Sequence, residues 1–170
     1  MPNPPSIREY APGDLRAGRG LWAELTLHHR RIYDDPTIGG DDPGAYFDVY
    51  LAASDRVASW VAVVDGEVVG LTGLLDHGGS GEIEPVVVTE ARRGQGIGRL
   101  LVDHVVGVAR ARGYRWLAIR PVARNRAAID AFYAAGFRTL GGHVDLTMDL
   151  APRVHRWLPG GRLHDLEVEY

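Results

Sequence analysis

The residues whose types and spacing point most directly to chemistry lie near the middle of the chain. Residues 86–88 are three valines, whose β-branched side chains favour a buried strand. Glycine then recurs at every second position from 94 to 98, and an apolar pattern with helical spacing begins at Ile97. Glycines let a ligand approach the main chain closely, and the unpaired N–H groups at a helix start attract anions. The stretch therefore predicts a phosphate or pyrophosphate site. Further positive charge comes from Arg92, Arg93 and Arg99.

Three known phosphate-binding patterns can be compared with this stretch. A P-loop requires a lysine followed by Ser or Thr, but all 19 basic residues of this chain are arginines. A Rossmann fingerprint requires G-x-G-x-x-G and an acidic residue at the end of the next strand, whereas here the next predicted strand runs into Arg120. The third pattern, R/Q-x-x-G-x-G/A, matches residues 93–98 at every position.

That third pattern resembles the pyrophosphate-binding signature of the GNAT superfamily of acetyl-CoA-dependent N-acetyltransferases. The resemblance extends over about residues 6–150, and it implies acetyl-CoA as co-substrate and no metal. It also implies that the main chain of the valine strand pairs with the pantetheine arm. The candidate cofactor-binding residues are Val86, Val87, Val88, Arg93, Gly94, Gln95, Gly96, Ile97, Gly98, Arg99 and Asn125.

A second stretch, residues 125–137, resembles the family pattern N-x-x-A-I-x-x-Y-x-x-x-G-F. The family tyrosine, thought to protonate the departing CoA thiolate, falls on Phe132, and Tyr133 follows one residue later. One residue is a rotation of about 100° on a helix. Three interpretations remain open. A local distortion brings Tyr133 to the thioester, water or substrate protonates the thiolate, or the pair is a core aromatic beside a surface one.

Direct acetyl transfer requires a neutral amine. Deprotonating an alkylamine with a pKa of about 10.4 at neutral pH costs about 4–5 kcal/mol, so a carboxylate base is expected. Glu82 and Glu84 are two apart on the strand that precedes the glycine turn, which predicts a shared face. Glu84 is the candidate base, because GNAT enzymes often keep their base on this strand; a solvated strand edge is the alternative. The chain has no cysteine, so attack within a ternary complex is favoured over an acetyl-cysteine intermediate.

The acceptor pocket is expected between the first two predicted helices, their loop and the last strands. A metal site at His28 and His29 is disfavoured, because adjacent residues do not share a helix face. The acceptor itself is not identified by the sequence. The candidate lining residues are Trp22, His28, His29, Tyr33, Asp34, Asp35, Tyr46 and Tyr50.

Length and composition limit the classes of protein. A chain of 170 residues with 45% hydrophobic and 24% charged residues indicates one ordinary globular domain. A net charge of −3 argues against nucleic-acid binding. No apolar run has the length of about 18 residues that spans a bilayer, and no signal peptide is evident, so a cytoplasmic protein is expected.

The periodicity predicts an α/β domain with a mixed sheet. With the family resemblance, this implies a single GNAT-like domain over residues 1–150, with a mixed, mostly antiparallel sheet whose central strands splay and which helices flank. Residues 151–170 are too apolar for a free tail, and within them residues 166–170 alternate like a strand. This extension is predicted to pack on the domain or on a second subunit, as in a homodimer. The predicted strands are 7–10, 58–64, 67–75, 82–89, 114–122 and one or two within 137–150, and the predicted helices are 15–33, 43–54 (with Asp42 as N-cap), 97–112 and 125–135.

The sequence supports one leading function and two alternatives. The leading hypothesis is an N-acetyltransferase that moves the acetyl group of acetyl-CoA to a primary amine of a small molecule or protein. An alternative from another class is a regulatory module that binds CoA or acyl-CoA with little or no catalysis, which Phe132 favours. A third is transfer of a longer acyl group.

Overall fold

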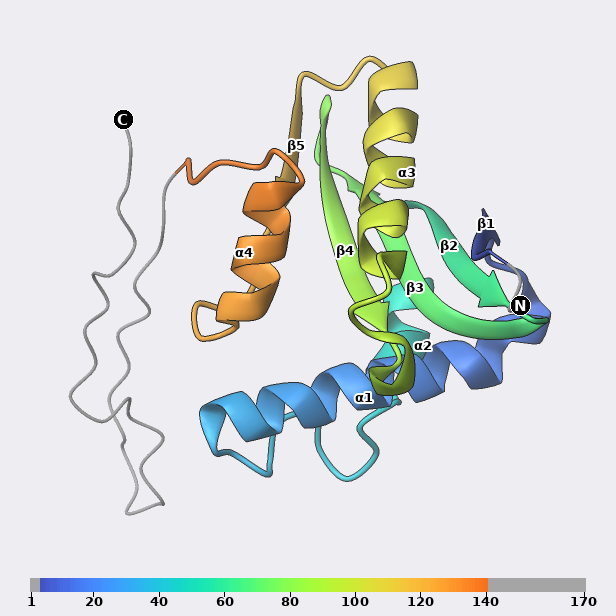
Figure 1. Cartoon of the computed structure of the whole chain (residues 1–170), viewed down its shortest axis with the longest axis vertical. Helices are drawn as coiled ribbons and strands as arrows, with labels where there is room; N and C mark the ends of the chain where they lie inside the picture. Colours follow the sequence, from blue (N-terminus) through green and yellow to red (C-terminus); the bar gives the residue numbers. More distant parts are fainter. Residues whose placement is uncertain (1–3, 141–170) are drawn as a thin grey trace.

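The computed structural model describes residues 4–140, which form one five-stranded sheet with helices packed on both faces (Figure 1). The strands are β1 (Ser6–Glu9), β2 (Arg56–Val64), β3 (Glu67–Asp76), β4 (Ser80–Val88) and β5 (Trp116–Ile119). The helices are α1 (Leu15–Tyr33), α2 (Tyr46–Leu51), α3 (Ile97–Ala111) and α4 (Arg126–Ala134), with short 3-10 turns η1 (Pro12–Asp14) and η2 (Glu90–Arg92). Within these residues, no helix is long and apolar enough to cross a membrane.

The sheet follows chain order, β1-β2-β3-β4-β5. The first four strands are antiparallel to their neighbours, and β5 alone is parallel to β4, with α3 as the crossover. An Asp65–Gly66 turn joins β2 to β3, and both residues have positive φ (50° and 84°), as such two-residue hairpins require. The mixed, mostly antiparallel sheet expected from the sequence is therefore confirmed.

Two helical layers bury the two faces of the sheet. On one face, Trp22 of α1 and Phe47 and Tyr50 of α2 pack on Val61, Leu71 and Val87 of the strands. On the other face, α3 contributes Val102 and Val105 to a cluster with Trp60, Leu74 and Ile83, and Phe132 of α4 packs against the same cluster. Figure 1 shows α1 crossing the end of the sheet where β4 finishes, and α4 beside β5. The end of β4 thus lies between α1 and α3.

Most predicted elements are present, with differences at their ends. The predicted bounds of α1 match the structure. The strand predicted at 114–122 is shorter, since β5 contains only Trp116–Ile119. Residues 137–140 do not form the predicted strand, and the rest of that prediction, together with the predicted extension 151–170, lies outside the described residues.

The second helix was predicted to start after Asp42, and this is wrong. Pro43 to Ala45 form a turn, and the N-cap of α2 is Ala45. The Asp42 Oδ1 atom accepts a hydrogen bond from the Gly44 N–H at 3.0 Å, which is the local turn that Asp side chains favour. Gly44 is packed so closely on α1 that a Cβ there would lie 2.7 Å from the Arg19 carbonyl oxygen. Contact with α1 therefore fixes this segment as a turn.

Two glycines of α1 allow a matched test of this packing. A Cβ at Gly18 would overlap the ring of Phe47, which is fully buried among other rings, whereas a Cβ at Gly20 meets nothing within 4 Å. We expect Gly18→Ala to lower the free energy of unfolding by about 1–3 kcal/mol through overpacking. Gly20→Ala should raise it by about 0.5–1 kcal/mol, since alanine is the better helix former. Chemical denaturation measures both, and an equal stabilisation by the two variants would contradict the described contact between α1 and α2.

Candidate active site

The neighbouring strands β4 and β5 separate halfway along β4. Their parallel pairing runs from Ser80↔Trp116 to Ile83↔Ile119 and stops there. Extending the register by two places would bring Pro85 opposite Pro121, and neither residue has an N–H group to donate. On its other side, β4 has a register shift against β3 opposite Gly73. The expected splay is therefore present between β4 and β5, and it starts at Glu84, although β5 is the edge strand of the sheet among the described residues.

Beyond this point, the valine run has one hydrogen-bonded edge and one open edge. Val86, Val87 and Val88 pair with Thr72, Leu71 and Gly70 of β3. Within residues 4–140, no strand pairs with the opposite edge of this run. Their side chains alternate between the two core layers, with Val87 buried on the α1 side. An extended ligand with amide groups can add to such an edge as an extra strand.

The open edge leads into the glycine turn. Gly94 and Gly96 have φ values of 73° and 80°, which side chains rarely adopt, and a Cβ at either position meets nothing within 4 Å. Gly96 is the N-cap of α3, and no side chain caps this helix. Among the described residues, no hydrogen bond reaches the N–H groups of Gly94, Gln95 or Gly96. The turn therefore presents free N–H donors at the positive end of α3, which suits an anion.

The two arginines predicted for this site have different surroundings. The Arg93 Nε atom donates to the Val88 carbonyl oxygen at 3.0 Å, so this side chain folds back over the end of β4. The Arg99 Nε atom lies 2.8 Å from Asp103, and its Nη1 atom donates to the Ala134 carbonyl oxygen at 2.9 Å. Arg99 thus joins α3 to the end of α4, and Asp103 balances its charge.

The sequence analysis missed a carboxylate on α1 that holds the end of β4. The Glu24 carboxylate accepts hydrogen bonds from the Thr89 hydroxyl at 2.7 Å and from the Glu90 N–H at 2.8 Å. It also lies 4.0 Å from Arg93 Nη2. No local pattern identifies Glu24, because its partners are more than 60 residues away in the sequence.

The two glutamates of β4 have different environments. Glu82 is buried, and its carboxylate accepts from His77 Nε2 at 2.9 Å and contacts the Arg120 guanidinium. Glu84 is exposed as a residue, yet partial desolvation of its carboxyl group raises its pKa above the ordinary value. The charge of Asp55 adds to this increase, and that of His77 opposes it. Glu84 therefore lies where the strands part, with no ion pair recorded among the described residues.

The two adjacent aromatic residues of α4, Phe132 and Tyr133, lie in different environments. Phe132 packs into the cluster on the α3 side of the sheet, with its ring 6.3 Å from that of Phe137. Tyr133 is half-buried, and its hydroxyl hydrogen-bonds the Thr139 hydroxyl. Asn125, predicted to bind the cofactor, caps α4, since its Oδ1 atom accepts from the Ala128 N–H at 3.3 Å.

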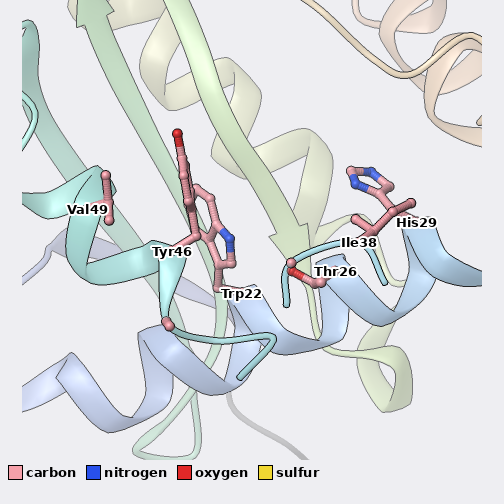
Figure 2. A pocket seen from close by; sticks show the side chains of 8 residues that line it. Trp22, Thr26, His29, Ile38, Tyr46 and Val49 are labelled. Atoms are coloured by element: carbon pink, nitrogen blue, oxygen red, sulfur yellow. The ribbon is translucent and has the colours of Figure 1, made fainter. Parts of the chain in front are cut away.

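A pocket opens between α1, α2 and their connecting loop (Figure 2). Of the predicted acceptor residues, Trp22, His29 and Tyr46 line it. Tyr50 lies beneath them, and its hydroxyl is 2.9 Å from Ser59 Oγ; burial raises the pKa of Tyr50 to about 12. Asp35 is buried and accepts from the Thr37 N–H, while Tyr33 lies under the Arg124 guanidinium. His28, Tyr33, Asp34, Asp35 and Tyr50 are not among the lining residues.

Arg124 is a second residue that the sequence analysis missed. It precedes α4, and its Nη1 atom donates to the Ile32 carbonyl oxygen at the end of α1, 3.2 Å away. Its guanidinium also lies 5.2 Å from the centre of the Tyr33 ring. The loop that follows β5 is thereby joined to the C-terminal end of α1. In the described part of the chain, no group of three or more His, Asp or Glu side chains is placed to hold a metal ion.

Comparison with known proteins gives the family. No curated protein sequence matches the chain significantly. A transcriptional regulator from Bacillus halodurans C-125 is a solved structure with a TM-score of 0.67 and 22% identity, covering 85% of this chain and 100% of that one. AAC(6')-Iy, solved with a CoA-acetylneamine bisubstrate analogue, has a TM-score of 0.63 and 20% identity, covering 86% and 99%. An acetyltransferase from Trypanosoma brucei has a TM-score of 0.62 and 21% identity, covering 85% and 100%.

Because these three structures share only 20–22% identity with the chain, the similarity to them shows the fold alone. It extends over most of each chain. The family model for the GNAT acetyltransferase family matches residues 23–137, which include the separated strands, the glycine turn and α4. This match spans more than half of the 170 residues. The chain belongs to the GNAT family of acetyltransferases.

Proposed function

We propose that the protein transfers an acetyl group from acetyl-CoA directly to a primary amine of a small molecule or protein. The observation that carries this proposal is the continuous path from Glu84 along the open edge of residues 86–88 to the free N–H groups of the glycine turn. Acetyl-CoA has matching groups in the same order: a thioester, two pantetheine amides and a pyrophosphate. The space around Gly94 and Gly96 leaves room for the pyrophosphate at the start of α3.

In the proposed reaction, the amine gives up a proton before or during attack. The Glu84 carboxylate accepts it, directly or through water, and a pKa above the ordinary value makes this carboxylate a stronger base. The neutral nitrogen then forms a bond to the thioester carbonyl carbon. The carbon–sulfur bond breaks and the CoA thiolate leaves. The newly bonded nitrogen loses its second proton to give the neutral amide, and the thiolate takes up one proton. Because the chain has no cysteine, no acetyl-cysteine intermediate forms.

The pyrophosphate site can be tested at Gly96. A tryptophan at this position would fill the space in front of the α3 N-terminus, so Gly96→Trp should lose acetyl-CoA binding in isothermal titration calorimetry. Gly113 is a matched control, because it also has positive φ (75°), has nothing within 4 Å of a Cβ, and follows the other end of α3. Gly113→Trp should carry similar backbone strain but retain binding. Unchanged affinity in Gly96→Trp would reject this site.

The role of Glu84 predicts both a rate and a pH effect. Glu84→Gln should lower kcat by roughly 100-fold, the usual scale for a lost general base, with little change in acetyl-CoA affinity. In the wild type, kcat/KM should rise with pH as Glu84 deprotonates. This rise in kcat/KM should be centred at a higher pH than the pKa of an ordinary carboxyl group, and it should be absent in Glu84→Gln. The control Glu67→Gln removes an exposed carboxylate at the β2–β3 turn and should leave kcat unchanged. Equal turnover in both variants would exclude Glu84 as the base.

Tyr133 is the proposed acid for the thiolate, and its hydrogen bond to Thr139 supplies a control. If the hydroxyl delivers the proton, Tyr133→Phe should lower kcat by at least about tenfold. Thr139→Val breaks the same hydrogen bond but keeps the phenol, so it should retain most of the activity. An unchanged kcat in Tyr133→Phe would leave water or the substrate as the acid. Acetyl-CoA binding without thiol release on any amine would instead favour the regulatory binding module.

A further inference from the structure

The pocket between α1 and α2 has the size of a small-molecule site. Its volume is about 440 Å³, within the range of roughly 300–1,000 Å³ that is usual for such sites. Trp22, Thr26 and His29 line it from α1, and Tyr46 and Val49 from α2. Figure 2 shows these side chains on the two helices, with the strands of the sheet passing behind the Trp22 and Tyr46 rings. The remaining lining residues are Ile38, Gly39 and Ala45.

The lining contains no carboxylate and no guanidinium. The Thr26 hydroxyl already donates to the Pro43 carbonyl oxygen at 2.9 Å. Burial, together with the neighbouring His28, lowers the pKa of His29, so this imidazole is neutral at neutral pH. Transfer of a cation into such surroundings loses hydration without gaining an opposite charge. The pocket therefore favours an uncharged group.

Three aspartates close to the pocket in the sequence have partners, and two exposed ones, Asp34 and Asp41, are not among the lining residues. Asp42, before α2, and Asp48, within α2, both form ion pairs with Arg19. Asp35 accepts from the N–H and the hydroxyl of Thr37. Within the lining itself, a cationic acceptor with several amines therefore finds no carboxylate.

Aromatic rings connect the pocket to the separated strands. The Tyr46 ring centre lies 5.8 Å from that of Trp22, which lies 5.3 Å from that of Tyr50. The Tyr50 hydroxyl lies against Gly73, because a Cβ added to this glycine would overlap the hydroxyl. The same Cβ would lie 2.7 Å from the Glu84 carbonyl oxygen. Burial raises the pKa of Tyr50, and the charge of the Glu84 carboxylate adds to this increase, so the proposed base acts on the Tyr50 end of this row of rings and the pocket lies at the Tyr46 end.

We infer that the acceptor is a small primary amine that carries an uncharged aromatic ring, and that this ring lies in the pocket against Tyr46 and Trp22. The inference rests on the proposed acetyl transfer and adds the substrate class to it. The amine, on a short linker, extends from the ring towards Glu84. Planar rings pack well against aromatic side chains, whereas the pocket offers a polyamine no opposite charge.

A panel of amines tests the substrate class at saturating acetyl-CoA. We expect kcat/KM for 2-phenylethylamine and tryptamine to exceed that for butylamine, putrescine and neamine by at least about tenfold, the scale of a lost apolar contact. Tyr46→Ala should raise the KM for the aromatic amines and thereby reduce their advantage in kcat/KM by roughly tenfold. The KM for acetyl-CoA should not change. Tyr46 is 59% exposed, so the variant should fold.

Two further variants sharpen the test. Leu27→Ala removes another exposed apolar side chain of α1 that does not line the pocket, and it should leave the preference unchanged. Val49→Asp places a carboxylate in the lining at a position that is 57% exposed. It should lower kcat/KM for 2-phenylethylamine and raise it for putrescine. A shift in the opposite direction would overturn the inference.

The outcomes separate this inference from the proposed function. If kcat/KM for putrescine or neamine equals or exceeds that for the aromatic amines, the inference is overturned and acetyl transfer is retained. The same holds if the Tyr46 ring binds the cation of such an amine. If acetyl-CoA binds but no amine is acetylated, the proposed function fails. In that case calorimetry of 2-phenylethylamine with the CoA-loaded protein decides the inference. Binding that Tyr46→Ala abolishes would support an aromatic ligand site, and the absence of binding would overturn it.

Discussion

The structure depends on one interruption of hydrogen bonding, between β4 and β5. The strands pair in parallel as far as Ile83 and Ile119. Two residues further along each segment is a proline, Pro85 within β4 and Pro121 just after the end of β5. A proline donates no N–H group, so the ladder cannot continue across these positions. Everything proposed for the site follows from this break, because among residues 4–140 no strand pairs with this edge of the second half of β4.

Several hydrogen bonds between distant segments connect the elements around the separated strands. Glu24 binds the end of β4 from α1, and Arg124 joins the loop after β5 to the C-terminal end of the same helix. Arg99 joins α3 to α4 on the other side. These contacts connect segments 35 to 92 residues apart in the sequence, and together they span the separated strands. Hydrogen bonds to charged groups are worth about 1.5–3 kcal/mol each where they are shielded from water, and less at exposed positions.

The two glutamates of β4 illustrate how position decides chemistry. Glu82 still lies within the paired part of the strand, where Arg120 and His77 satisfy its carboxylate. Glu84 is the first residue after the pairing ends, and partial desolvation, with the charge of Asp55 in addition, raises the pKa of its carboxyl group. Residue type is the same in both cases. The difference is that one carboxylate stabilises the sheet and the other remains available at the gap.

The sequence by itself determined the order of strands and helices over residues 6–136, the glycine turn at the start of α3 and the family pattern around it. These features depend on local periodicity and on backbone conformations that favour glycine, and such signals are contained within a few neighbouring residues. Sequence reasoning was wrong about the start of α2, because contact with α1 through Gly44 overrides the local Asp-Pro signal. Only the tertiary structure distinguished Glu84 from Glu82, brought Glu24 and Arg124 to the ends of the separated strands, and assembled an uncharged pocket from α1 and α2. Those arrangements depend on contacts between distant segments, for which a single sequence carries no local signal.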